Sequence, residues 1–347
     1  MSEYVNELRD SAKQVVDGTG VAAAEAVIWP LVAELGWLLT TVPEELDGLG
    51  MGVQEACALF TELGRGLDQS PFLPAMLAVD ALCQSSVADK ADLVMRFATG
   101  ECVTAPLSVP AITLDSSAGT LSGMQAAVAS ADNASHALFW TAAKDCVVLV
   151  PLDQAGVEIK ARETWDTTRR LFDVTLQNLA LDQQLVLAKG DEAASLIARI
   201  ETLRDFGLAA DSLGASAKLL DITIDHLQTR KQFGRPLALF QALKHRCADM
   251  KTLNAGAEAL LADSLNRVGA DLSSADAQLK AKTVKYLACS AYADVAEDAL
   301  QLHGGIGMAS EHECHLFLKR AMLNEQLGDQ LDSYPASIAD SFLSAQG

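Results

Sequence analysis

Two segments in the second half of the sequence combine arginine, glutamine and paired glycines, residue types suited to binding a phosphate-bearing ligand. The first, TRKQFGRPLALFQALKHRCADM, spans residues 229–250, and the second, ALQLHGGIGMASEHECHLFLKRA, spans residues 299–321. Arg230 can offer a planar fork of hydrogen-bond donors to a pyrophosphate, which a lysine would serve less well. Gln301 can reach polar ligand atoms, and the glycine pair that begins at Gly304 lets the backbone approach a ligand closely. Each segment alone could equally be a structural turn, the first ending a helix and the second capping one.

The second segment also contains histidines that could act as a base or bind a metal. On a helix, His312 and His315 would share a face, but zinc needs further ligands that this spacing does not supply. We therefore expect no metal site and interpret both residues as exposed polar helix surface. We expect His303 to be a loop histidine rather than a general base. The sequence contains no GxSxG elbow, GxGxxG motif or phosphate P-loop.

The elements that position these segments follow from the apolar periodicity. Apolar residues recur at three- and four-residue steps through the first hundred residues and again from Gly190 to Tyr334, which predicts helices. Short β-prone runs separated by turn residues occupy residues 102–187, as in an antiparallel sheet or barrel. We predict an α+β protein with a helical domain at 1–103, an antiparallel β domain at 104–188 and a helical bundle domain at 189–347.

Composition excludes several classes of function. The 347 residues include 26 Lys and Arg against 46 Asp and Glu, a formal charge of -20, so nucleic-acid binding is not expected without a basic patch. No apolar run is long enough to cross a bilayer, and the N-terminus lacks the apolar core of an export signal. Seven scattered cysteines without a CxxC pair indicate reduced thiols. We expect a cytoplasmic protein without membrane partners.

The order of elements and the two segments resemble the acyl-CoA dehydrogenase family. The loop PEELDGLGMG at residues 43–52 matches its N-terminal domain, and the short run LKRAMLNEQLGDQ resembles a subgroup that oxidises steroid side-chain CoA thioesters. The resemblance implies a helical N-terminal domain, a middle β domain, a C-terminal four-helix bundle and FAD as cofactor. In the family the two segments bind a flavin held mainly by a neighbouring subunit. By matching position, that role falls to Arg230, Phe233, Gln241, Gln301, Gly304 and Gly305.

The same resemblance shows that the catalytic base is missing. Family enzymes use a glutamate to remove a proton beside the thioester while hydride leaves for the flavin. That glutamate lies at one of two positions, which correspond here to Gly328 and Arg204. Neither residue can accept a proton at neutral pH. Asp205, Glu325 and Asp329 lie nearby in sequence, but we interpret them as solvated or capping acids, and Asp205 would face away from Arg204 by one helical step.

The β domain also departs from the family around the flavin ring. The family has a flavin loop rich in acidic, glycine and serine residues near the first strand, where this chain reads TAPLSVP at residues 104–110. The family places an aromatic and a hydroxyl residue beside the ring, where this chain has Ala127 and Ala129, which can neither stack nor hydrogen-bond. The run WDTTRR at residues 165–170 could reach a CoA phosphate in trans, but we expect an exposed hairpin.

These losses favour one hypothesis over two others. The chain resembles the non-catalytic subunit of a heteromeric acyl-CoA dehydrogenase with two copies of each of two related chains, and it would have no catalytic residue of its own. Its partners would be a paralogous catalytic subunit, an acyl-CoA substrate and an electron-transfer flavoprotein as acceptor. The alternatives are a self-sufficient dehydrogenase with a relocated base, Glu325 or Asp329, and a flavin-free homologue that binds acyl-CoA or scaffolds an assembly.

Overall fold

A computed structural model describes residues 3–329 and 331–344; the outer ends of the first and third predicted domains lie outside this range. The N-terminal region is helical, as the apolar periodicity predicts. Its longest buried stretch is the helix Phe72–Gln84. Every residue from Phe72 to Cys83 is buried, as expected for a helix that is apolar on all faces and enclosed by its neighbours. The helices are α1 (Glu3–Thr19), α2 (Glu25–Glu34), α3 (Val53–Arg65), α4 (Phe72–Gln84) and α5 (Lys90–Ala98), with short 3-10 turns at Trp37–Leu39 and Glu44–Leu46.

The middle region forms two four-stranded sheets that share an apolar core. One sheet has the order β1-β4-β5-β8 and the other β2-β3-β7-β6. All neighbours in these sheets are antiparallel, as expected, except the two-residue edge strand β1, which pairs with β4 in parallel. Apolar residues of both sheets, Leu121, Phe139, Val148 and Val174 among them, form one buried cluster. The strands are β1 (Val103–Thr104), β2 (Thr113–Asp115), β3 (Thr120–Ala129), β4 (His136–Trp140), β5 (Cys146–Pro151), β6 (Val157–Ala161), β7 (Leu171–Ala180) and β8 (Leu185–Lys189).

The C-terminal region is built on long helices that pack lengthwise. Helix α6 joins the bundle to the N-terminal region, because Gly64 of α3 and Gly214 of α6 bring the two backbones into contact where a Cβ atom would clash. Ser274 caps the start of α8 by accepting a hydrogen bond from the Ala277 N–H. The elements are α6 (Gly190–Thr229), β9 (Lys231–Gln232), β10 (Arg235–Pro236), α7 (Gln241–Arg267), α8 (Ala275–His303), α9 (Cys314–Gln326) and α10 (Tyr334–Ser344), with 3-10 turns at Leu237–Leu239, Gly304–Met308 and Leu331–Ser333; a further 3-10 turn, Leu181–Gln183, joins β7 to β8 in the middle region.

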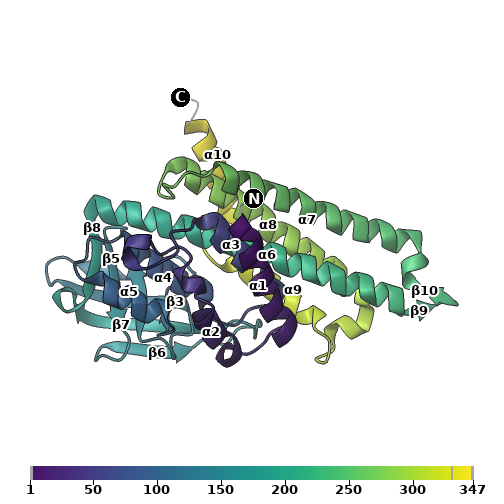
Figure 1. Ribbon diagram of the computed structural model, residues 1–347, viewed down its shortest axis with the longest axis horizontal. Coiled ribbons are helices and arrows are strands. Elements are labelled where there is room, and N and C mark those ends of the chain that lie inside the picture. Colours follow the sequence, from purple (N-terminus) through teal and green to yellow (C-terminus); the bar gives the residue numbers. More distant parts are fainter. Residues whose placement is uncertain (1–2, 330, 345–347) are drawn as a thin grey trace.

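Figure 1 shows how these parts lie relative to one another. Helices α6, α7 and α8 run side by side along the long axis of the molecule, and the sheets and the N-terminal helices cover one end of α6. The hairpin β9–β10 projects at the opposite end of the bundle. The predicted α+β fold, helical, then β, then a helical bundle, is confirmed. Among the described residues, no helix is both long enough and apolar enough to cross a bilayer.

Candidate functional site

The six residues predicted to bind a neighbour's flavin are exposed, and they lie at or next to the ends of helices α6, α7 and α8. Arg230 and Phe233 belong to the connection between α6 and α7 that carries the hairpin, Gln241 begins α7, and Gln301 lies in the last turn of α8. All six positions are exposed: Arg230, Phe233, Gln241, Gln301, Gly304 and Gly305. Gly304 has a φ of 64° and Phe233 a φ of 54°, so both turn through the left-handed region that an L side chain rarely adopts.

Exposed apolar side chains occur in both segments that carry these residues. Phe233 is 89% exposed, and Leu239, Ile306 and Met308 are each more than half exposed. The Phe233 ring lies 6.1 Å from that of Phe240, centroid to centroid. Large apolar side chains exposed in segments that also carry an arginine and a glycine turn are typical of surfaces that another chain covers. The donors present, a guanidinium, amides and unobstructed backbone, fit the pyrophosphate and adenosine of a dinucleotide.

The two positions that hold the base in the family lie next to each other in space. A Cβ atom on Gly328 would lie 3.2 Å from Nη2 of Arg204 and 3.1 Å from Oη of Tyr334. Gly328 also has a φ of 76°, a conformation that suits glycine and strains other residues. A side chain of any size at position 328 would therefore meet the Arg204 guanidinium, so that space is already taken by a cation.

Arg204 is the centre of a buried charged cluster. Its Nε and Nη2 atoms each lie 3.0 Å from Oδ1 of Asp205, and Oη of Tyr334 donates to Oδ2 of Asp205 at 3.1 Å. Lys285 is fully buried, donates to the Leu327 carbonyl and lies 4.4 Å from the centre of the Tyr334 ring. Burial disfavours the charge on Arg204, but Asp205, Tyr334, Glu201 and Asp329 together outweigh burial and hold the pKa of Arg204 above its usual value. Two cations thus lie where the family has a carboxylate.

The three acids near this position differ in their surroundings. The prediction that Asp205 is a solvated or capping acid is wrong: it is 2% exposed, and both carboxylate oxygens are engaged by Arg204 and Tyr334. Burial raises the pKa of Glu325, as do Asp294 and Glu297, which are exposed on α8, so Glu325 faces the outside of the bundle. Asp329 is half-buried next to Gly328, and its backbone oxygen lies 3.4 Å from Nζ of Lys285.

The positions that surround the flavin ring in the family are also in direct contact with one another. The Leu107 N–H donates to the Ala127 carbonyl at 3.2 Å, and the Gly328 N–H donates to the Leu107 carbonyl at 2.5 Å. Leu107 is fully buried, and Ala127 and Ala129 are 9% and 5% exposed. Backbone hydrogen bonds therefore link the β region directly to Gly328 through Leu107. Two alanines, an arginine and a closed backbone contact do not fit an isoalloxazine ring, so this chain's own ring site does not suit the cofactor.

The expectation of an exposed hairpin at residues 165–170 is wrong except at its tip. Trp165 is 81% exposed, but Asp166, Thr168 and Arg169 are buried. Nη2 of Arg169 lies 3.0 Å from Asp211 on α6, and Arg170 pairs with Glu25 and Asp132. Both arginines are held in ion pairs within the chain, and the buried guanidinium of Arg169 needs its carboxylate partner because an unpaired buried charge is costly.

The histidines of the second segment also differ from expectation. Helix α9 begins at Cys314, so His312 precedes it and does not share a helical face with His315. His315 is half-buried, and both of its ring nitrogens lack solvent contact. His303 is the last residue of α8 and is 5% exposed, rather than lying in a loop. It lies beside His312 and beside His226 of α6, which the sequence analysis did not single out; its position one helical turn before Arg230 was the signal that could have found it.

Family models, related sequences and solved structures all match this chain to acyl-CoA dehydrogenases. Residues 3–101 match the model described as acyl-CoA dehydrogenase, N-terminal domain, and residues 201–328 match acyl-CoA dehydrogenase, C-terminal domain. The acyl-CoA dehydrogenase IpdE2 of Mycobacterium tuberculosis is 31% identical over 304 residues, which cover 86% of this chain and 81% of that protein. The ChsE4-ChsE5 complex of Mycobacterium tuberculosis contains a chain 24% identical with a TM-score of 0.86, covering 99% of this chain and 98% of that one. A Tcur3481-Tcur3483 steroid ACAD variant is also 24% identical, with a TM-score of 0.85 and 99% of both chains covered.

Proposed function

The chain belongs to the acyl-CoA dehydrogenase family of FAD-dependent oxidoreductases that act on CH–CH bonds, and from this premise we propose that it is the non-catalytic subunit of a heteromeric member. In this proposal two copies of this chain assemble with two copies of a paralogous catalytic chain. The catalytic chain supplies the base and the contacts to the flavin ring. This chain supplies the exposed half of the cofactor site at the end of its bundle.

The observation that carries the proposal is the contrast between two sets of residues. Arg204 and Leu107, at positions that match the family's reaction centre, are both buried. Leu107 accepts a hydrogen bond from the Gly328 N–H, and the Arg204 guanidinium lies where a side chain at position 328 would project. The six residues predicted to bind a neighbour's flavin are all exposed. A chain that had lost the whole function would have no reason to retain the second set, and an independent enzyme would need the first.

The chemistry assigned to this chain is binding and positioning. FAD in the family accepts the hydride that leaves the acyl-CoA. Arg230 would hold the pyrophosphate through its planar fork of donors, and the turn at Gly304 and Gly305 would let the adenosine approach the backbone. Phe233 and its apolar neighbours would be covered by the catalytic chain, which removes them from water. Proton removal from the substrate would occur on the catalytic chain alone.

Similar proteins support the assembly and the substrate class. One structural neighbour belongs to the ChsE4-ChsE5 complex. Another belongs to Tcur3481-Tcur3483, which is described as a steroid ACAD. We infer a CoA thioester of a steroid side chain as substrate of the assembled enzyme, and an electron-transfer flavoprotein as its acceptor. The seven cysteines, all within the described residues, are free thiols, which supports a cytoplasmic location.

Amide substitution of the two remaining candidate bases tests the assignment of proton removal. The variants Glu325→Gln and Asp329→Asn, each in the complex with the catalytic chain, are expected to keep kcat within about twofold of the unsubstituted complex, because neither carboxylate takes part in the reaction. The measurement is acyl-CoA-dependent reduction of an artificial electron acceptor. The matched control is the Glu→Gln variant of the partner's base, which should abolish turnover. A loss of about 100-fold or more in Glu325→Gln or Asp329→Asn would contradict the proposal and identify a relocated base.

A further inference from the structure

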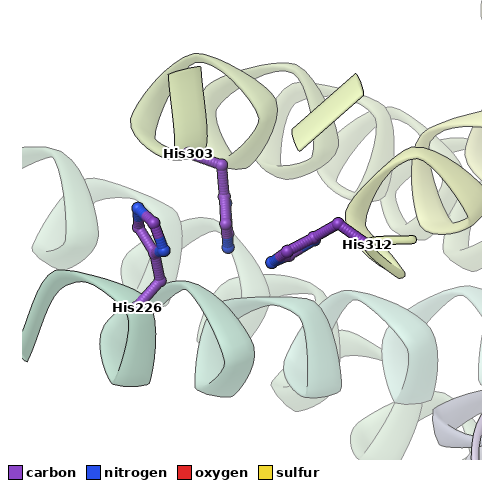
Figure 2. A group of neighbouring side chains, drawn as sticks. All are labelled: His226, His303 and His312. Atoms are coloured by element: carbon purple, nitrogen blue, oxygen red, sulfur yellow. The ribbon is translucent and has the colours of Figure 1, made fainter. Parts of the chain in front are cut away.

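Three histidines from separate elements converge near the turn that contains Gly304. His226 lies in the last turn of α6, His303 ends α8, and His312 lies in the loop before α9. A ring nitrogen of each lies within 4.8 Å of those of the other two. Figure 2 shows the tip of His303 directed between the other two rings, with the tip of His312 directed toward it. None of the three belongs to the six residues assigned to the flavin, so the cluster is unexplained by the proposed function.

His303 is held with a lone pair directed into this cluster. Its Nδ1 lies 2.8 Å from the Ala299 carbonyl, to which it donates, so Nε2 carries the lone pair. The residue is 5% exposed, and its Nε2 is buried without a hydrogen-bond partner among the described residues. A neutral histidine whose Nδ1–H is fixed by a backbone carbonyl is the form in which proteins present Nε2 to a metal.

The other two rings have the freedom to close around an ion. His226 and His312 are half-buried, in the last turn of a helix and in a loop. His312 accepts a hydrogen bond from the Cys314 N–H at Nδ1, 3.1 Å, which leaves Nε2 for the cluster. Coordination through Nε2 would move the ring proton to Nδ1 and break that bond. Zinc–nitrogen bonds of about 2.0–2.1 Å place tetrahedral ligand atoms about 3.4 Å apart, so the rings must approach by roughly 1.4 Å at most.

We propose that His226, His303 and His312 bind one divalent transition-metal ion, with zinc as the reference ion. Three imidazoles without a carboxylate select zinc, copper, nickel or cobalt over magnesium and calcium, and they leave a fourth position open for water. The ion would tie the ends of α6 and α8 to the loop before α9, and thereby fix the turn at Gly304 relative to Arg230. The inference does not depend on the proposed function, because it rests on the histidines alone.

Zinc titration of the full-length chain tests this site. Tag-free, chelator-treated protein is titrated with ZnCl₂ by calorimetry, and we expect a site of one ion per chain. His226→Gln and His303→Gln should each weaken that site by about 10-fold or more, since each removes one of three ligands. Cobalt substitution gives a second readout: the unsubstituted chain should show the visible absorption of cobalt in a low-symmetry nitrogen site, and both variants should lose it.

The control is His245→Gln, which makes the same histidine-to-glutamine change at an exposed position on α7, outside the cluster. It should bind zinc as the unsubstituted chain does, and magnesium at equal concentration should not compete. Because His226 is half-buried, its variant keeps the test valid if His303→Gln fails to fold. The inference is overturned if the unsubstituted chain shows no stoichiometric zinc site, or if His226→Gln binds zinc as tightly as His245→Gln does.

Discussion

Replacing Arg230 by alanine in the assembled complex is expected to weaken FAD binding by about 10- to 100-fold. A charge-assisted hydrogen bond contributes about 1.5–3 kcal/mol, and Arg230 can make two to a pyrophosphate. Arg230 is exposed in the isolated chain, so its substitution should leave the fold intact. Flavin retained after gel filtration, together with the FAD concentration that restores half-maximal activity, measures the effect.

Two further variants test whether FAD affinity depends on the planar hydrogen-bond donors of Arg230 or only on its positive charge. Arg230→Lys keeps the charge but loses the planar geometry, and we expect FAD affinity between that of the unsubstituted complex and that of Arg230→Ala. Arg267→Ala removes another arginine, 70% exposed at its side chain and paired with Asp263 on the surface of α7, and should leave FAD affinity unchanged. Equal flavin content in Arg230→Ala and Arg267→Ala would show that this chain does not hold the cofactor.

Replacing Arg320 by alanine is expected to lower the free energy of unfolding by about 3–5 kcal/mol, because it leaves buried acids without a partner. Arg320 is fully buried on α9, and its guanidinium lies 3.1 Å from Asp166 and 3.3 Å from Asp211. It also donates to the Thr168 carbonyl at 2.7 Å. The cluster therefore links the β region to two bundle helices. Urea unfolding followed by circular dichroism measures the loss, and Arg267→Ala, at an exposed pair, should change it by less than about 1 kcal/mol.

The same cluster predicts how stability depends on pH. Burial alone would raise the pKa of Asp211, but Arg169 and Arg320 more than offset burial and hold that pKa below its usual value. A carboxyl whose pKa is lowered by folding contributes stability above its unfolded pKa, about 3.9, and loses it as pH falls through the folded value. The stability difference between the unsubstituted chain and Asp211→Asn should therefore be full at pH 7 and shrink below about pH 4. A difference that does not change with pH, or an Arg320→Ala chain as stable as Arg267→Ala, would contradict this account of the cluster.

Periodicity was sufficient to predict the order of helices and strands, because amphipathic helices and β-prone runs leave local signals. It could not predict which charges pair in the core. One helical step separates Asp205 from Arg204 and predicts that they face different ways, yet the long arginine side chain reaches back to its buried neighbour. The local sequence predicts Arg169 on the surface of a hairpin. Its ion pair with Asp211 could not be predicted, because Asp211 comes from a distant element that only the tertiary fold brings near.

The site was predictable only in part for the same reason. Motif matching places Arg204 and Gly328 at the two positions where the family has its base. It does not show that the Arg204 guanidinium lies beside Gly328, where a side chain would project. The three histidines come from separate elements, and only the packing of α6 against α8 and α9 brings them together. The exposure of the six residues proposed to bind flavin is likewise a property of the folded bundle, since sequence spacing does not show which end of a helix is left uncovered.

The flavin-to-protein ratio of the co-purified complex tests the central claim most directly. The chain is expressed alone and together with a paralogous chain that keeps a glutamate at the position of Gly328, and FAD is quantified by absorbance after denaturation. We predict colourless, inactive protein from the single chain and one FAD for each pair of chains in an active complex. Two FAD molecules for each pair, or a yellow and active preparation of this chain alone, would contradict a subunit that binds only its partner's flavin.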